Sequence, residues 1–365
     1  MMRNVLPYLM LLVLLQYGFC QSPAHQLAYE EAFFELDRMA RGTAPYRFKE
    51  AVFAVENAFH GDSLSKAWFD REIEQLTNLS QSLNLQLDIK DYPDKARMEL
   101  AGKIYYALIR KSEMKISEEE KIYLEPYTYD FEDIWGEKDW NQMFVYKLLK
   151  THKGNCHSLP YLYKIIADEL GVPAYLAFAP NHIYIKQYFQ QNGWYNTELT
   201  NPSFPTDAWL MVSGYTHIDA IRNGIYLDTL GQKGTLAQCF VDLAKGYERQ
   251  FPTQVGFRKK CIQKALELHP KNINALLMQA EADLQHFQYA VKLKGYEMND
   301  WQGDEEIHGM FARIEQQYAY IHLSGYRQMP KDMYLDWLGK LETEKNKYTN
   351  KKVTDNHKTN QTTPK

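Results

Sequence analysis

Apolar residues in the first third of the chain recur every three or four positions, which predicts helices. The rest of this stretch, from Ser22 to Lys121, is mostly polar, and no group of catalytic side chains stands out in it. We therefore predict a helical region at residues 21–125. Its apolar faces include Ala51, Phe53, Ala54, Ala58, Leu64, Trp68, Phe69, Ile73, Leu76, Leu100, Ala101, Ile104, Tyr105 and Leu108.

The pattern changes between Tyr127 and Asp228, where short apolar runs alternate with turn residues. The fold class that we predict is α+β, mostly helical, with a small core of helix and antiparallel sheet at residues 126–232. Gly171 and Pro173 are stop signals for its second helix. The predicted elements are helices at 140–149 and 156–170 and strands at 174–178, 182–189 and 194–200.

Helical spacing returns from Gly234 to about residue 345. Ala265 followed by Pro270 resembles the end of a tetratricopeptide repeat, where small residues let paired helices cross and proline stops the second helix. We predict a tetratricopeptide-like region at residues 233–345; a generic helical hairpin is the alternative. The remaining chain is polar and rich in lysine, which predicts a disordered basic tail at residues 346–365.

The amino-terminal residues 1–20 have the pattern of a secretory signal. A positive start is followed by an apolar run from Val5 to Leu15, which is too short to span a bilayer, and by small residues at Gly18 and Cys20. We expect cleavage before Gln21 and export to the periplasm or the extracellular space. Lipoprotein anchoring at Cys20 is the less favoured alternative, because bulky Phe19 precedes it.

Composition excludes several classes of protein. The chain has 365 residues, 45% hydrophobic and 24% charged, with a net charge of −4, which describes a globular protein of two or three units. Nothing in this balance attracts nucleic acid. No further stretch is long enough for a membrane span. Cleavage would leave Cys156, Cys239 and Cys261, too few for a disulfide framework in an oxidising compartment.

The first group of candidate catalytic residues lies in the run His152-Lys153-Gly154-Asn155-Cys156-His157-Ser158. A cysteine that opens a helix lies near free N–H groups and the positive end of the helix dipole, and both favour the nucleophilic thiolate. Lys153 and His157 add positive potential. The alternative is a buried structural thiol, because Cys156 shares a helical face with apolar residues.

Two further candidates follow on the predicted strands. His182 begins a strand after the turn Pro180-Asn181, and Glu198 ends the return strand that contains Trp194. A histidine and an acid at such positions suit a base and the group that orients it. A lone histidine is more often structural, and metal binding by Cys156, His157 and His182, with His152 nearby, is disfavoured because no paired ligand spacing occurs.

Together these motifs resemble the transglutaminase-like superfamily, whose members share a papain-like cysteine-protease core. The resemblance implies that Cys156 is the nucleophile, His182 the base and Glu198 the acid, although the family has aspartate there. Asn196 is the alternative partner of His182. A narrower, bacterial family resembles most of the mature chain, since it combines a helical amino-terminal region, this core and tetratricopeptide-type helices.

The resemblance implies an exported cysteine hydrolase or acyltransferase that acts on an amide bond of a peptide or protein, without a cofactor or metal. Many relatives lack the cysteine in the Gly154–Leu159 stretch. The alternative function is therefore a non-catalytic scaffold that binds a peptide or protein partner.

The hairpin between the last two strands conflicts with this assignment. Asn192-Gly193 is a strong signal for a two-residue turn, which would pair Gln191 with Trp194. His182 and Glu198 would then point to opposite faces of the sheet. We therefore predict that this tight turn does not form, and that a loop of about five residues from Tyr188 to Asn192, or a bulge, sets Glu198 opposite His182.

Overall fold

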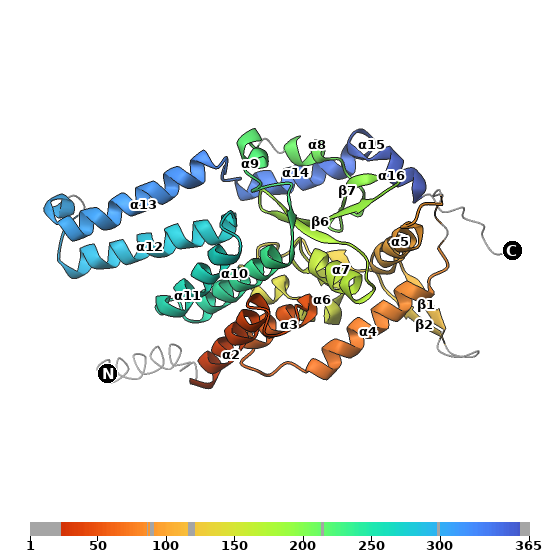
Figure 1. Cartoon of the computed structure of the whole chain (residues 1–365), viewed down its shortest axis with the longest axis horizontal. Coiled ribbons are helices and arrows are strands. Elements are labelled where there is room, and N and C mark those ends of the chain that lie inside the picture. Colours follow the sequence, from red (N-terminus) through yellow and green to blue (C-terminus); the bar gives the residue numbers. More distant parts are fainter. Residues whose placement is uncertain are drawn as a thin grey trace, which may run out of the picture.

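The computed structural model describes residues 23–357 except for 86, 88–90, 116–120, 213–214 and 298–299. Most of this part is helical, and the helices surround a small antiparallel sheet (Figure 1). The predicted α+β class with mostly helices is confirmed. The predicted signal, residues 1–20, lies outside the described residues, as does the alternative anchor Cys20.

The amino-terminal region is helical up to residue 109, as predicted, and then forms a short hairpin that the sequence pattern did not indicate. The helices are α2 Pro23–Ala40, α3 Phe48–Phe59, α4 Lys66–Ser82 and α5 Lys95–Ile109. The hairpin consists of β1 Ser112–Lys115 and β2 Lys121–Leu124, which are antiparallel. Side chains on these helices bury a continuous apolar face, which explains the helical spacing seen in the sequence.

The central region contains the sheet and the short elements around it. Its helices are η1 Trp140–Met143, α6 Val145–Thr151, α7 Ser158–Glu169, α8 Asp207–Val212 and α9 Ile218–Arg222. Its strands are β3 Thr128–Tyr129, β4 Lys153–Gly154, β5 Tyr175–Ala179, β6 His182–Phe189, β7 Gly193–Thr197 and β8 Thr229–Leu230. The sheet has the order β7-β6-β5-β8 with antiparallel neighbours, while β3 and β4 form a separate parallel pair.

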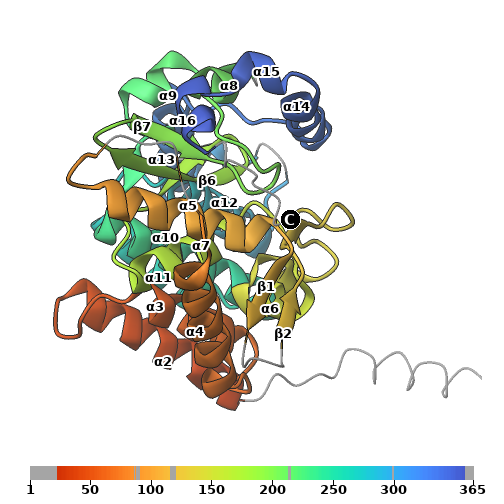
Figure 2. The ribbon, with the colours of Figure 1, turned by 90° about the vertical axis from the view of Figure 1, so that its right-hand side faces the viewer.

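The carboxy-terminal region is helical, as predicted. Some of its helices project from the body, and others pack against the sheet. Its elements are α10 Gln232–Gln250, α11 Val255–Leu268, α12 Ile273–Leu293, η2 Asp300–Gly303, α13 Glu305–Leu323, α14 Lys331–Thr343, α15 Lys345–Tyr348 and α16 Lys351–Asn356. The α12–α13 hairpin projects from the body in Figure 1. Helix α14 instead returns to the sheet, on the side opposite α7 (Figure 2). No helix in the described ranges has the length and apolar character needed to cross a membrane.

One hydrophobic core joins the three predicted regions. It extends from Tyr29 on α2 through the sheet to Trp337 on α14 and Val353 on α16. The projecting hairpin has a separate small cluster, in which Phe287 packs edge-on against Trp301. Because the main core is shared, the sheet is held between helices from both ends of the sequence.

The prediction of a disordered tail from residue 346 is wrong for the part that the structure describes. Tyr348 and Val353 are buried, and the Tyr106 hydroxyl donates a hydrogen bond of 2.8 Å to the carbonyl oxygen of His357. A few apolar anchors therefore hold this polar segment against α5. Composition averages over the segment and misses such anchors.

Candidate functional site

Cys156 lies in a tight turn that the sequence before α7 imposes. Gly154 is required there, because a Cβ atom would collide with the Ser158 hydroxyl and the Leu148 side chain. Asn155 closes the turn, since its side-chain oxygen accepts hydrogen bonds from the backbone N–H groups of His157 at 2.9 Å and Ser158 at 3.1 Å. The helix therefore begins at Ser158, two residues later than predicted, and Cys156 lies just before it.

The backbone of Cys156 is consequently free to act on a ligand. Its N–H group donates no hydrogen bond to any part of the chain that the structure describes. The side chain is 8% exposed, and its sulfur lies 3.7 Å from the carbonyl oxygen of Asn181. When a thiol attacks a carbonyl group, negative charge develops on the carbonyl oxygen. An unpaired N–H group beside the sulfur is placed to donate a hydrogen bond to that oxygen.

His182 follows a two-residue turn between β5 and β6. Ala179 pairs with His182, which leaves Pro180 and Asn181 as the turn, and Asn181 has a positive φ of 56°. Proline followed by asparagine suits a type II turn, because proline fixes the first φ and asparagine tolerates the left-handed region. The Asn181 side chain also donates a hydrogen bond to the carbonyl oxygen of Met329 at 2.9 Å. The turn is thus fixed to the segment before α14.

A short hydrogen bond joins His182 and Glu198. The Nε2 atom of His182 lies 2.6 Å from a carboxylate oxygen of Glu198, and both side chains are buried. The second carboxylate oxygen accepts hydrogen bonds from the backbone N–H groups of Leu199 and Thr200 and from the Thr200 hydroxyl, at 2.6 to 2.9 Å. This network holds Glu198 rigidly against the ring.

The electrostatics of the pair favour its charged form. Burial alone would lower the pKa of His182, but the Glu198 carboxylate, its hydrogen bond to the ring and the neighbouring Cys156 thiol raise it to about 10. Burial alone would raise the pKa of Glu198, but the His182 charge and the donors around the carboxylate lower it. His182 is therefore an imidazolium at neutral pH.

The strand register explains how glutamate reaches the histidine. Phe189 pairs with Gly193, so the loop is Gln190–Asn192 and the two-residue turn is absent, as predicted. The loop is three residues long, rather than about five. The last pair is Ile185 with Thr197, so Glu198 lies opposite the position of Tyr184, two residues from His182, on the same face. The extra methylene of glutamate spans this diagonal, which aspartate spans less readily.

Asn196, the alternative partner, makes its contacts elsewhere. Its side-chain nitrogen donates hydrogen bonds to the carbonyl oxygen of Pro205 at 3.1 Å and to Asp207 at 2.8 Å. Glu198, and not Asn196, accepts the hydrogen bond of the His182 ring.

Two tyrosines adjoin the thiol and the ring. The Tyr334 hydroxyl on α14 lies 3.1 Å from Nδ1 of His182. The Cys156 thiol is a neighbour that acts on the same ring, while its own hydrogen bond goes to the carbonyl oxygen of Asn181 at 3.7 Å. The Tyr129 hydroxyl contributes to the same electrostatic group as Cys156 and Tyr334. It has no partner with good hydrogen-bond geometry in the described part of the chain. Tyr129 is therefore a neighbour of the thiol without a formed hydrogen bond.

A second histidine–carboxylate pair adjoins Cys156. The Nε2 atom of His157 lies 3.1 Å from Asp242 on α10, and Nδ1 lies 2.9 Å from the carbonyl oxygen of Met143. Both partners accept hydrogen bonds, so each ring nitrogen of His157 faces an acceptor. Despite burial, the His157 charge and the hydrogen bonds of His157 and Tyr161 lower the pKa of Asp242.

A cavity of about 280 Å³ lies beside Cys156 and His182, near the lower end of the range for ligand sites. Its walls come from the segment before Cys156, the β5–β6 turn and helices α3, α10 and α12. Apolar and aromatic side chains predominate, and the polar side chains include Glu56, His157, Gln238, Asp242, Lys245 and Asn274. The helices on both sides of the central region therefore shape the space in front of the thiol.

The other two cysteines are structural. Cys239 and Cys261 are buried, and burial raises the pKa of each thiol well above its usual value. Among the residues that the structure describes, no three His, Cys, Asp or Glu side chains gather closely enough to hold a metal ion. Cys156 thus differs from the other thiols in its setting.

Sequence reasoning missed three participants. Tyr334 lies 152 positions from His182, and no local pattern connects the two. Tyr129 is brought to the site by the pairing of β3 with β4, which is only two residues long. Only a weak indication of Asp242 was present in the sequence, because it is an acid close to the apolar face of α10. Comparison of this chain with family models, curated proteins and solved structures finds no match.

Proposed function

We propose that this protein is a cysteine hydrolase or acyltransferase of transglutaminase-like type, with Cys156 as nucleophile, His182 as acid–base group and Glu198 as orienting acid. The observation that carries the proposal is the buried His182–Glu198 hydrogen bond of 2.6 Å, with the Cys156 thiol as a neighbour of the same ring. The substrate would be an amide of a peptide or protein, and export through residues 1–20 belongs to the same proposal.

The charged His182–Glu198 pair sets the chemistry. An imidazolium beside a thiol favours the thiolate, so the proton resides on His182 before the substrate arrives. The thiolate attacks the carbonyl carbon, and a sulfur–carbon bond forms while the carbonyl electrons move to oxygen. The free N–H group of Cys156 stabilises that oxyanion. His182 then gives its proton to the leaving amine, and the acyl-enzyme remains.

Hydrolysis completes the cycle. Water replaces the amine, and neutral His182 takes a proton from it as it attacks the acyl carbon. The thiolate leaves, and His182 is again protonated beside it. His157 is the residue next to Cys156 and faces an acceptor at each ring nitrogen, and a positive charge on its ring would favour the same thiolate.

The alternative is a scaffold in which the core has lost catalysis and a peptide partner binds near it. The observation that favours it is the capping of His182 by α14: the ring is buried, and its Nδ1 atom contacts the Tyr334 hydroxyl. The cavity at Cys156 favours the enzyme, because the thiol remains reachable from that side.

Alkylation distinguishes the two functions. We expect iodoacetamide at pH 7 to label Cys156 at least about tenfold faster than Cys239 and Cys261. Mass spectrometry measures the three labelling rates. We also expect a burst of nitrophenolate from p-nitrophenyl acetate, equal to the enzyme concentration, which Cys156→Ser abolishes. Equal labelling of the three thiols together with no burst would favour the scaffold.

A further inference from the structure

The cavity beside Cys156 holds several polar groups, and most of them already have partners. Asp242 accepts hydrogen bonds from His157, Tyr161 and Gln238, at 2.7 to 3.1 Å. Glu56 accepts two hydrogen bonds from the backbone N–H groups at the start of α6, at 2.7 and 2.8 Å. These acids therefore hold the walls together and are not available to a ligand.

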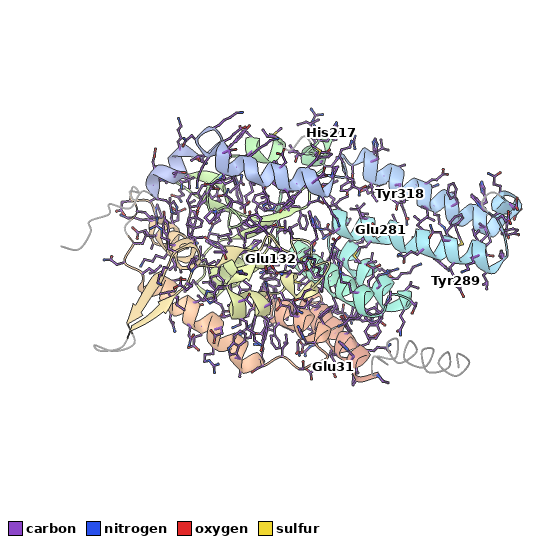
Figure 3. The ribbon with its side chains drawn as sticks, turned by 180° about the vertical axis from the view of Figure 1, so that it is seen from behind. Glu31, Glu132, His217, Glu281, Tyr289 and Tyr318 are labelled. Atoms are coloured by element: carbon purple, nitrogen blue, oxygen red, sulfur yellow. The ribbon has the colours of Figure 1, made fainter. Side chains whose placement is uncertain are left out.

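Lys245 is the exception in this cavity. It lies on α10, three residues after Asp242 and on the same side of the helix, and it is half-buried. Its ammonium group makes no hydrogen bond, ion pair or cation–π contact with any residue that the structure describes. Its charge acts on Asp242 and on Glu281 of α12 from a distance. Figure 3 shows Glu281 on the part of α12 nearest the body.

None of the acids around the cavity contacts Lys245 directly among the described residues. Burial raises the pKa of Glu56 to about 8, despite its backbone donors, so this acid is mostly neutral at pH 7. Asp242 already has a partner in His157 at 3.1 Å, which lowers the pKa of this acid. A half-buried cation among apolar walls is stabilised by an anion, and the chain supplies none in direct contact.

The rest of the cavity fits an apolar chain. Aliphatic and aromatic side chains line it from several parts of the sequence, for example Val55, Ile134, Trp140, Phe178, Leu277 and Tyr326. The volume of about 280 Å³ accommodates one side chain or a short acyl group, and not a folded domain.

We propose that the cavity binds an apolar chain that ends in a carboxylate, and that Lys245 binds this carboxylate while the reacting carbonyl lies at Cys156. This inference rests on the proposed function, since it names the substrate class for the same site. The substrate is then an acyl donor whose acyl part carries an acidic end group, and Lys245 is a specificity-determining residue.

A binding experiment tests the inference without requiring catalysis. Hexanoate and hexanamide, which differ only in their end group, are titrated into the Cys156→Ser protein, and binding is followed by tryptophan fluorescence, since Trp135 and Trp140 line the cavity. We expect hexanoate to bind about tenfold more tightly than hexanamide, because a charge-assisted hydrogen bond forms. In a protein that also carries Lys245→Met, the preference disappears, and Lys245→Arg restores it.

The matched control is Lys292→Met, which removes an exposed lysine at the far end of α12 and should leave the preference unchanged. Equal binding of the two probes, or no binding of either, overturns the inference. These outcomes are separate from failure of the proposed function, which is equal alkylation of the three cysteines with no burst. An active enzyme without a carboxylate preference would reject the role of Lys245 alone.

Discussion

Two histidine–carboxylate pairs adjoin the same cavity, His182 with Glu198 and His157 with Asp242, and they differ at the second nitrogen of each ring. In His182 this nitrogen contacts the Tyr334 hydroxyl, which can give or take a proton, and the Cys156 thiol is a neighbour of the same ring. In His157 it contacts the carbonyl oxygen of Met143, which only accepts. In the proposed mechanism the first ring exchanges its proton with a substrate, whereas the second faces an acceptor at each nitrogen. The same residue types thus have different surroundings, and the proposal gives the acid–base role to His182 alone.

The largest difference should appear when each ring is removed in turn. We expect His182→Gln to slow alkylation of Cys156 at pH 7 by about 100-fold, because the proton acceptor is lost. His157→Gln removes only a nearby charge, and we expect a decrease of less than about fivefold. Rates of carbamidomethylation measured by mass spectrometry check both values. Equal losses in the two variants would mean that the pairs do not differ in role.

The next prediction concerns the charge of Glu198. Glu198→Gln leaves a buried histidine without its counter-ion and should lower the free energy of unfolding at pH 7 by about 3 kcal/mol. It should also remove a pH dependence. Because the folded pKa of His182, about 10, lies above its ordinary value of 6.5, the pair's stabilisation is full below pH 6.5 and is lost as pH rises towards 10.

Urea unfolding at pH 6.5 and pH 10 measures this pH dependence. The wild type should lose more stability between the two pH values than Glu198→Gln does. At the acid end the sign reverses, since the lowered pKa of Glu198 gives stability above pH 4.5 that is lost as pH falls. A variant with the same pH dependence as the wild type would contradict the charged state of the buried pair.

A smaller effect is expected at the second pair. Asp242→Asn keeps the shape of the side chain but removes the charge that His157 faces, and we expect a loss of about 1–3 kcal/mol in unfolding free energy. Alkylation of Cys156 should fall by no more than about threefold, since the acid–base ring is untouched. Asp336→Asn, at an exposed ion pair with Lys340, serves as the control and should change neither quantity. A loss of alkylation as large as that of His182→Gln would assign proton transfer to His157.

The smallest effect is expected at the hydroxyl above His182. Tyr334→Phe removes the competing contact at Nδ1 while keeping the ring that packs against Trp337. We expect Cys156 to react about two- to fivefold faster, because one net hydrogen bond no longer holds the imidazole away from the thiol. Tyr215→Phe, another tyrosine whose hydroxyl contacts Met333 of α14, is the matched control. Slower alkylation in Tyr334→Phe would show that the hydroxyl supports the thiolate.

Local sequence signals predicted the elements around Cys156 and His182 well, because proline, glycine and asparagine act on their own neighbours. Gly154 and the Pro180-Asn181 turn are in this class. The competing Asn192-Gly193 signal was rejected because a one-residue change in register would have separated His182 from Glu198. The exact pairing was not predictable, since it depends on how β7 packs as well as on its turn.

Contacts between distant segments could not be predicted. Tyr334 reaches His182 only because α14 returns to the sheet after the α12–α13 hairpin, and nothing near residue 334 indicates this course. Composition also failed for the segment after residue 346, where the buried Val353 outweighs many lysines. Such long-range packing is decided by the whole core and not by any one stretch.

Because α14 covers His182, this residue becomes buried only late in the synthesis of the chain. Tyr334 follows His182 by 152 residues. At ribosomal rates of about 5–20 residues per second, roughly 8–30 s pass between the synthesis of His182 and that of Tyr334, which covers it. Throughout that interval Trp209 lacks Trp337, the ring on which it stacks at 4.3 Å. Until α14 has been made, a nascent chain therefore exposes an aromatic surface beside Cys156, His182 and Glu198.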